Sequence, residues 1–208
     1  MTINLVKKTD PIEEPVSLAE AKLHLRIGGD PDASPAETHI DDTLVLALIK
    51  AARRWCEAFQ NRAYVTQTWD LYLDKFPVES FIELPKPPLQ SLVALTYKDS
   101  AGASQTVSFV DPSGTALLET DDYIVDTTCE PGRLCLKNGK SWPAALLEPK
   151  AIEIEFVAGY GAAEDVPDEI KAAIKIALSS LYENRGDAES EMSSTVKALL
   201  WPDRIVPI

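Results

Sequence analysis

The sequence predicts an α+β protein in which a helical core carries an inserted antiparallel β domain. Apolar residues recur at helical spacings of three and four in two stretches, about residues 38–61 and 161–186. Between these stretches, residues 63–160 contain short segments in which apolar and polar residues alternate, as in half-buried strands. Helices and strands therefore come in separate runs, which is typical of α+β proteins and not of alternating βαβ folds.

The chain begins with a stretch that contains two prolines, residues 1–16, and we expect an extended arm there. Ser17 and Glu20 have the spacing of a capping box, in which each side chain satisfies the other residue's free backbone amide. This predicts a first helix that runs to about Leu25 and is stopped by the glycines that begin at Gly28.

The second helix is predicted from about Thr38 to Asn61, which corresponds to roughly 36 Å of helix. A second row of apolar residues beside the first makes its stripe wide, so we expect packing partners on more than one side. The first row is Ile40, Leu44, Leu48, Ala51, Trp55 and Phe59, and the second is Val45, Ile49, Ala52 and Cys56.

The middle of the chain is predicted to form a small antiparallel sandwich or barrel. Turn residues such as Asn138-Gly139 separate the alternating segments, and prolines lie between strands or at edges, where a missing donor is tolerated. The expected strands are 68–74, Phe81–Leu84, Leu92–Lys98, Thr106–Val110, Tyr123–Asp126, Arg133–Leu136 and Ala151–Ala158.

These patterns predict four segments. Residues 1–62 hold the arm and the first two helices, and 63–160 form the inserted β domain. Residues 161–186 form a third helix that packs with the second, since Pro167 suits a first helical turn. Residues 187–208 form a C-terminal arm that starts polar and ends apolar.

No arrangement of residues predicts an active site, a cofactor site or a metal site. The two histidines, His24 and His39, stand outside any nucleophile–base motif. The glycines at Gly159 and Gly161 lack the rest of a phosphate-binding loop. The three cysteines, Cys56, Cys129 and Cys135, lack zinc-site spacing, and the acidic pairs at 41–42, 121–122 and 153/155 suit helix starts, loops and a wet strand face.

Charge and hydropathy exclude further classes of function. With a formal net charge of −13, the chain should be repelled by DNA, which argues against a general nucleic-acid-binding protein. No apolar run approaches the roughly 18 residues that a membrane span requires, and the first residues are too polar for a secretory signal. We therefore expect a protein that is cytosolic or assembled in the cytosol.

The C-terminal arm is the strongest candidate for a partner interface. Large apolar residues are costly to leave in water, and tryptophan and arginine are common interface anchors. The alternative, that the arm folds back on the chain's own core, stays open. Arg54 can either reach a carboxylate of a neighbouring subunit or remain solvated. The candidate interface residues are Leu199, Leu200, Trp201, Arg204, Ile205, Val206 and Arg54.

A series of short motifs, in order and over roughly residues 14–186, resembles the head–tail connector (adaptor, or head-completion) family of long-tailed phages and gene transfer agents. The similarity is to its larger members, whose helical core carries a β insertion. The motifs are EPVSLAEAK from Glu14, HLR from His24, LIKAAR from Leu48, TQTW from Thr66, LPKPPL from Leu84, SWP from Ser141, FVAGYG from Phe156, VP from Val166, IK from Ile170 and LYENR from Leu181.

The resemblance implies a structural protein without catalysis or a cofactor. Such a protein forms a ring of about twelve copies at the head–tail joint of a virion, between the portal protein and a tail-side connector or tail terminator, and DNA passes through the lumen without specific binding. Many copies of an acidic subunit would give an acidic lumen. The chain can stay monomeric until the portal orders its arms. Two alternatives are a different virion module, such as a tail-completion protein, and an enzyme with an unrecognised acidic metal site.

Overall fold

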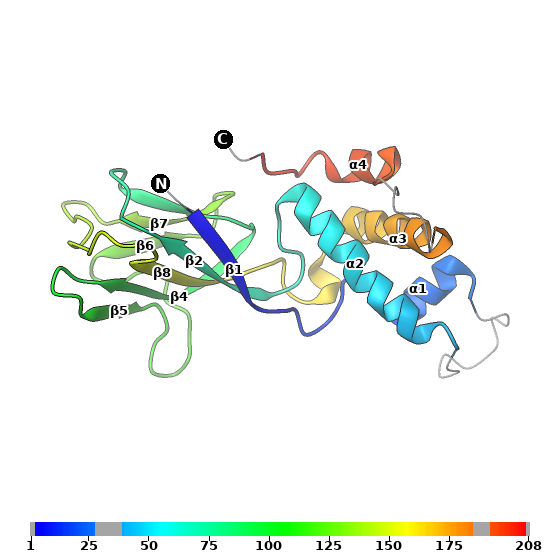
Figure 1. Ribbon diagram of the computed structural model, residues 1–208, viewed down its shortest axis with the longest axis horizontal. Helices are drawn as coiled ribbons and strands as arrows, with labels where there is room; N and C mark the ends of the chain where they lie inside the picture. The colour runs from blue at the N-terminus through cyan, green and yellow to red at the C-terminus, as the bar shows by residue number, and fades with distance from the viewer. Residues whose placement is uncertain (1–2, 28–38, 185–191, 207–208) are drawn as a thin grey trace. The chain divides into compact units, whose positions relative to one another are not determined.

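The computed structural model describes residues 3–27, 39–184 and 192–206 and has the predicted α+β fold (Figure 1). The chain forms two compact units. The β unit consists of Met1–Pro11 and Thr66–Tyr160, and the helical unit of Ile12–Val65 and Gly161–Ile208. The expected helix stop at Gly28, the expected helix start at Thr38 and the polar first part of the C-terminal arm lie outside the described residues.

The β unit contains two antiparallel sheets, and its strands closely match the predicted ones. The five-stranded sheet has the order β1 (Ile3–Thr9), β2 (Gln67–Leu73), β8 (Ile152–Ala158), β4 (Leu89–Lys98) and β5 (Ser104–Ser108). The three-stranded sheet has the order β3 (Phe81–Leu84), β7 (Gly132–Leu136) and β6 (Tyr123–Asp126).

Alternation of apolar and polar residues explains which face of each strand is buried. On β8 the burial pattern alternates along the whole strand, with Ile152, Ile154 and Phe156 completely buried. Ile154 lies opposite Leu71 of β2 on one side and Leu95 of β4 on the other. Apolar side chains of neighbouring strands thus form continuous rows, and their burial is the main source of the unit's stability.

Aromatic rings form a second cluster in the β unit. The rings of Phe76 and Trp142 stack with their centroids 5.1 Å apart, and Trp142 also stacks on Tyr123 at 5.7 Å. Tyr97 meets Phe76 edge-on at 5.9 Å. Because Tyr97 belongs to β4 and Tyr123 to β6, the cluster joins the two sheets through two loop residues. Burial raises the pKa of the Tyr123 hydroxyl to about 12.

The N-terminal segment, which the sequence predicts as an arm, forms strand β1 at the edge of the large sheet. Leu5 lies opposite Leu71 and Val6 opposite Asp70. The strand has only seven residues and includes Lys7 and Lys8, so its alternation is too short to stand out in the sequence. Lysines on an edge strand also discourage pairing with further strands.

The helical unit contains α1 (Leu18–Leu25), α2 (Asp42–Gln60), α3 (Asp168–Glu183) and α4 (Ser194–Leu200), with a 3₁₀ turn at Ala163–Asp165. The predicted capping box is confirmed: the Ser17 hydroxyl accepts from the Glu20 N–H at 3.2 Å, and the Glu20 carboxylate accepts from the Ser17 N–H at 2.8 Å. Arg26, with φ of 55°, then ends α1 in the left-handed conformation.

Helix α2 packs along α3, while α1 and α4 each contact both of them (Figure 1). The buried stripe of α2 is centred on the second predicted row, which includes Val45, Ile49 and Cys56. Of the first row, Ile40 is exposed, whereas Trp55 and Phe59 are half-buried. The stripe is wide enough for either row to be its centre, and only the positions of the neighbouring helices decide between them.

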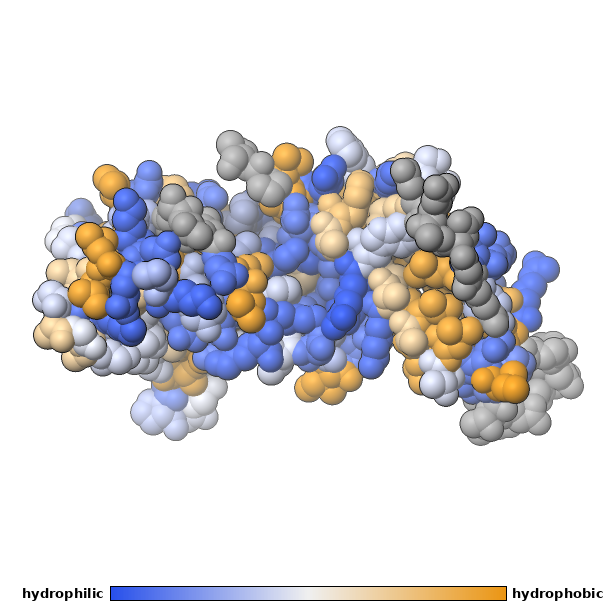
Figure 2. Space-filling view, in the orientation of Figure 1, coloured by the Kyte–Doolittle hydropathy of each residue, from blue (hydrophilic) through white to orange (hydrophobic). Residues whose placement is uncertain are grey.

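On the face shown in Figure 2, hydrophobic side chains form patches among hydrophilic ones. The exposed large hydrophobic residues are Val6, Ile12, Leu23, Ile40, Leu46, Val78, Leu118, Ile124, Leu147, Trp201 and Val206. Within the described ranges, the helices lack the combination of length and hydropathy that crossing a bilayer demands.

Candidate functional site

The side chains that catalysis or metal binding would require do not come together in the described part of the structure. His39 is engaged at the start of α2, where its Nδ1 accepts from the Asp41 N–H at 3.2 Å and its own N–H donates to Asp42 at 2.9 Å. His24 is exposed on α1. Over the described part of the chain, three or more histidine, cysteine or acidic side chains never gather in a way that could hold a metal ion.

The acidic pairs have structural partners. Asp41 accepts from the Tyr182 hydroxyl at 2.8 Å and so ties α2 to α3, while Asp42 forms an ion pair with Lys22 of α1 at 3.0 Å. Asp122 pairs with Lys140 at 2.6 Å beside the small sheet. In these contacts the carboxylates have a structural role, because they hold helices and loops in place.

The outer face of the large sheet carries an acidic group around one lysine. Lys8 Nζ lies 2.8 Å from Glu155 Oε1 and 3.8 Å from Asp70 Oδ1, and the Tyr72 hydroxyl donates to Glu153 at 3.3 Å. Burial raises the pKa of Asp70, and the charges of Glu153 and Glu155 raise it further, against the opposing effect of Lys8. This face therefore has excess negative charge that one lysine only partly neutralises.

The C-terminal segment, residues 193–206, folds onto the helical unit. The Ser193 hydroxyl caps α4 by accepting from the Val196 N–H at 3.2 Å, and Leu200 at the end of α4 is fully buried. Hydrogen bonds then join the segment to the end of α2. Gln60 Nε2 donates to the Leu200 carbonyl at 2.7 Å, the Ile205 N–H donates to the Gln60 carbonyl at 2.9 Å, and Asn61 Nδ2 donates to the Ile205 carbonyl at 2.8 Å.

A stack of rings and one guanidinium completes this attachment. The Arg204 guanidinium lies 4.6 Å from the ring centroid of Phe59 and 5.3 Å from that of Trp201. The two rings are 6.5 Å apart. Cation–π contacts of this kind contribute about 0.5–2 kcal/mol, depending on exposure. The stack holds the arm to the last turn of α2 while leaving 61% of Trp201 exposed.

The structure thus sorts the predicted interface residues into two groups. Leu200 is buried and Ile205 is hydrogen-bonded within the chain, so both help to hold the arm in place. Trp201 and Val206 are exposed, at 61% and 63%, as is Arg54 on α2. Leu199 and Arg204 are half-buried. That these residues contact a partner stays a prediction.

One buried cluster was missed by the sequence analysis. Arg53 is only 1% exposed, and its Nε and Nη1 donate to Glu14 and Glu57, each at 2.7 Å. Burial by itself lowers the pKa of Arg53, but the hydrogen bonds and charges of Glu14 and Glu57 outweigh it and raise the pKa. The four-residue spacing of Arg53 and Glu57, on the face that includes Ile49, was the available signal.

This cluster continues to the arm. Glu57 also accepts from the Tyr64 N–H at 3.0 Å, and the Tyr64 hydroxyl donates to Gln60 Oε1 at 2.6 Å. The amide nitrogen of the same Gln60 donates to Leu200. A hydrogen-bonded chain of five residues therefore runs from Glu14, just before α1, to the C-terminal segment. Such connected networks fix geometry more than they add net stability.

Comparisons with known proteins find similarity at the level of the fold. The sequence matches no protein-family model and no curated protein. A chain in a structure described as the neck of an empty GTA particle, computed with C6 symmetry, matches with a TM-score of 0.77 and 21% identity. The match covers 100% of this chain and 97% of that chain.

Two further structures match over nearly the same length. One is the virion of a native gene transfer agent (GTA) particle, with a TM-score of 0.74, 23% identity and coverage of 98% and 96%. The other is the neck of a native GTA particle computed with C12 symmetry, with a TM-score of 0.71 and 20% identity. This match covers 100% of this chain and 97% of that chain. At these identities the comparison establishes the fold, and it confirms the resemblance predicted from the sequence at that level.

Proposed function

We propose that this chain is a structural head–tail connector subunit in the neck of a tailed phage or phage-like particle. The observation that carries the proposal is the match of the whole chain, both units included, to chains from particle necks at a TM-score of up to 0.77. The separate positions of the two histidines and the structural contacts of the acidic pairs support a role without catalysis.

In this proposal the subunits form a ring of about twelve copies between the portal protein and a tail-side connector or tail terminator. The C6 and C12 symmetries of the two neck structures support a ring. Ring contacts are heterologous, so each subunit presents two different surfaces to its neighbours. The exposed arm residues Trp201 and Val206, together with Arg54, are our candidates for contacts with the portal and with neighbouring subunits.

The charge of the chain suits a ring through which DNA passes without binding. At −13 per subunit, a ring of this kind repels the phosphate backbone, and so DNA slides instead of adhering. The acidic outer face around Glu153 and Glu155 is the surface that we assign to the lumen. A lumen lined with lysine and arginine in the assembled particle would contradict this part of the proposal.

The decisive experiment is co-expression of the chain with the portal protein of its particle in a bacterial cytoplasm, followed by size-exclusion chromatography and electron microscopy. We expect a monomer in isolation and a stacked ring with portal. A deletion of the gene should leave heads without tails. Normal necks in the deletion, or no co-purification with portal, would refute the function, whereas a ring of the isolated chain would refute only assembly on the portal.

Variants of the arm test the assigned surface. Trp201→Ala should abolish co-purification with portal, because a large, central aromatic side chain commonly contributes at least about 2 kcal/mol to an interface. Leu147→Ala, which shortens another exposed apolar side chain in the β unit, is the matched control. Equal binding by both variants would move the interface away from the arm.

A further inference from the structure

The β unit has an open edge beside a cavity, and we propose that this edge binds an extended segment of another protein chain by strand addition. The segment would carry alternating apolar and basic side chains. The inference stands on the β unit alone. It therefore survives if the chain proves not to form neck rings, and the proposed neck function survives if the edge binds nothing.

The free edge belongs to β3. This strand is the outermost of the small sheet and pairs with β7 on one side only. The Leu136 N–H donates to the Ser80 carbonyl, so in an antiparallel ladder Ile82 and Leu84 also point their backbone groups toward β7. Phe81 and Glu83 must then point theirs outward. The hydrogen bonds found among the described residues leave these outward groups unused.

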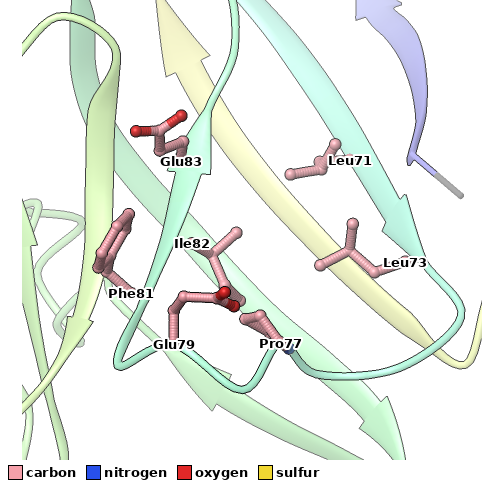
Figure 3. Close-up of a pocket in the computed structure, with 7 residues that line it drawn as sticks. All are labelled: Leu71, Leu73, Pro77, Glu79, Phe81, Ile82 and Glu83. Atoms are coloured by element: carbon pink, nitrogen blue, oxygen red, sulfur yellow. The ribbon is translucent and has the colours of Figure 1, made fainter. Parts of the chain in front are cut away.

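A cavity of about 330 Å³ lies along this edge (Figure 3). Leu71 and Leu73 of β2 and Ile82 of β3 point into it, and Pro77 and Glu79 border one end. The loop that carries Pro77 and Glu79 is held by the stack of Phe76 on Trp142, whose indole N–H donates to the Glu79 carbonyl at 2.8 Å. The cavity is therefore bounded by fixed elements of both sheets.

The chemistry of the occupant follows from side-chain alternation. A strand added beside β3 places every second side chain on the side of Ile82, where Leu71 and Leu73 also line the cavity, and the others on the side of Glu83. Glu83 and Glu79 are exposed carboxylates without an ion-pair partner among the described residues. Arg133 lies opposite Glu83 on β7, but its guanidinium stacks on Phe81 at 5.1 Å instead. Apolar residues thus fit on the side of Ile82, and basic residues fit beside Glu83 and Glu79 at the border of the cavity.

The other edges lack this combination. β1 carries Lys7 and Lys8, which disfavour the addition of a basic strand, and β5 has the sequence Ser-Gln-Thr-Val-Ser with a single apolar residue. β3 is only four residues long and offers two outward residues. Backbone pairing there is limited to a few hydrogen bonds, and we expect a dissociation constant on the order of 0.1–1 mM for a short peptide.

The test uses the full chain and an acetylated, amidated peptide with the sequence Lys-Val-Lys-Val-Lys-Val. Binding is measured by NMR titration and by hydrogen exchange. We expect shifts confined to β3 and the residues around the cavity, with the Phe81 and Glu83 amides becoming protected. The same peptide N-methylated at alternate residues keeps its charge and side chains but loses the backbone N–H donors along one edge. It should bind at least about tenfold more weakly.

Two variants separate backbone pairing from charge. Glu83→Pro removes the outward N–H and should abolish binding, since proline is tolerated at such an edge position. The double variant Glu79→Gln with Glu83→Gln should bind about fivefold more weakly, because exposed ion pairs are modest in strength. Glu164→Gln with Glu169→Gln is the charge-matched control in the helical unit. Equal binding of the N-methylated peptide, or no binding of the parent peptide at millimolar concentration, would overturn the proposal.

Discussion

The two units of this protein obtain a defined structure by different means. In the β unit, alternating apolar side chains on neighbouring strands form rows such as Leu71, Ile154 and Leu95. In the helical unit, the apolar stripe of α2 is interrupted by the buried charges of Arg53 and Glu57. A purely apolar core depends on how much area is buried, whereas a buried ion cluster depends on every partner being present.

The largest expected effect is therefore in the helical unit, on replacement of Arg53 by methionine. The change leaves Glu14 and Glu57 without their shared cation, and breaking a buried ion pair costs about 3–5 kcal/mol of stability. Urea denaturation measures the loss. Arg54→Ala changes the neighbouring exposed arginine and should alter stability by less than about 0.5 kcal/mol.

A thiol next to this cluster makes the measurement specific to the helical unit. Cys56 is completely buried, and burial raises the pKa of its thiol to about 12, so it should be inert to alkylating reagents in the native state. If Arg53→Met destabilises this unit, Cys56 labelling at a fixed pH should accelerate by about 100-fold or more. Adding Glu14→Gln and Glu57→Gln should slow labelling again. Unchanged labelling in all variants would show that the cluster does not stabilise this unit.

In the β unit, Leu95→Ala should cost about 3 kcal/mol of stability, because it removes a buried side chain from the row that includes Leu71 and Ile154 and leaves a cavity. The control is Thr96→Ala on the opposite face of the same strand, where only the contact with the Thr106 hydroxyl at 3.1 Å is lost. We expect less than about 1 kcal/mol there. Similar losses for the two variants would mean that inward burial does not dominate this unit.

The features that the sequence predicts are those that depend on local patterns, and the features that it misses depend on distant contacts. The strands and the capping box at Ser17 depend on local patterns, alternation and spacing, which are visible in the sequence itself. Which row of α2 is buried depends on where α1 and α3 lie, which no local pattern contains. Arg53 and Arg54 are identical neighbours in the sequence, although one side chain is buried and the other exposed.

The interface residues show the same limit more sharply. The apolar character of Leu200 and Trp201 marks both as candidates, and the structure buries the first while exposing most of the second. Leu200 is held there by a hydrogen bond from Gln60, 140 residues earlier in the chain. Periodicity carries no information about such distant polar contacts. Both the free edge of β3 and the attachment of the arm could therefore be recognised only from the structure.

The arm gives a smaller effect that tests whether it is held loosely. Arg204→Ala removes the guanidinium between Phe59 and Trp201 and should cost about 1 kcal/mol. Hydrogen exchange of the Ile205 amide should speed up by about fivefold, while Leu95 in the β unit is unaffected. Arg204→Lys retains the charge but not the planar stacking group, so the exchange rate of its Ile205 amide should lie between those of the unchanged protein and Arg204→Ala. An unchanged Ile205 amide in Arg204→Ala would mean that the hydrogen bonds with Gln60 and Asn61 hold the arm without the guanidinium.

The smallest expected effect is a pH dependence confined to the β unit. Hydrogen bonds from the Cys129 thiol and from the side chain and N–H of Thr128 lower the pKa of Asp126 to about 2. An unfolded aspartate titrates near 3.9, so the unfolded state binds the proton more readily. The stabilisation by Asp126 is therefore complete above about pH 4 and is lost as the pH falls toward 2. Asp126→Asn should flatten the decline of the unfolding free energy across this window, which denaturant titrations at several pH values measure. Asp121→Asn makes the same change of charge at an exposed position of the same unit, and it should leave the slope of the unfolding free energy against pH unchanged. An equally flattened slope in Asp121→Asn would assign the effect to overall charge and not to the hydrogen bonds of Asp126.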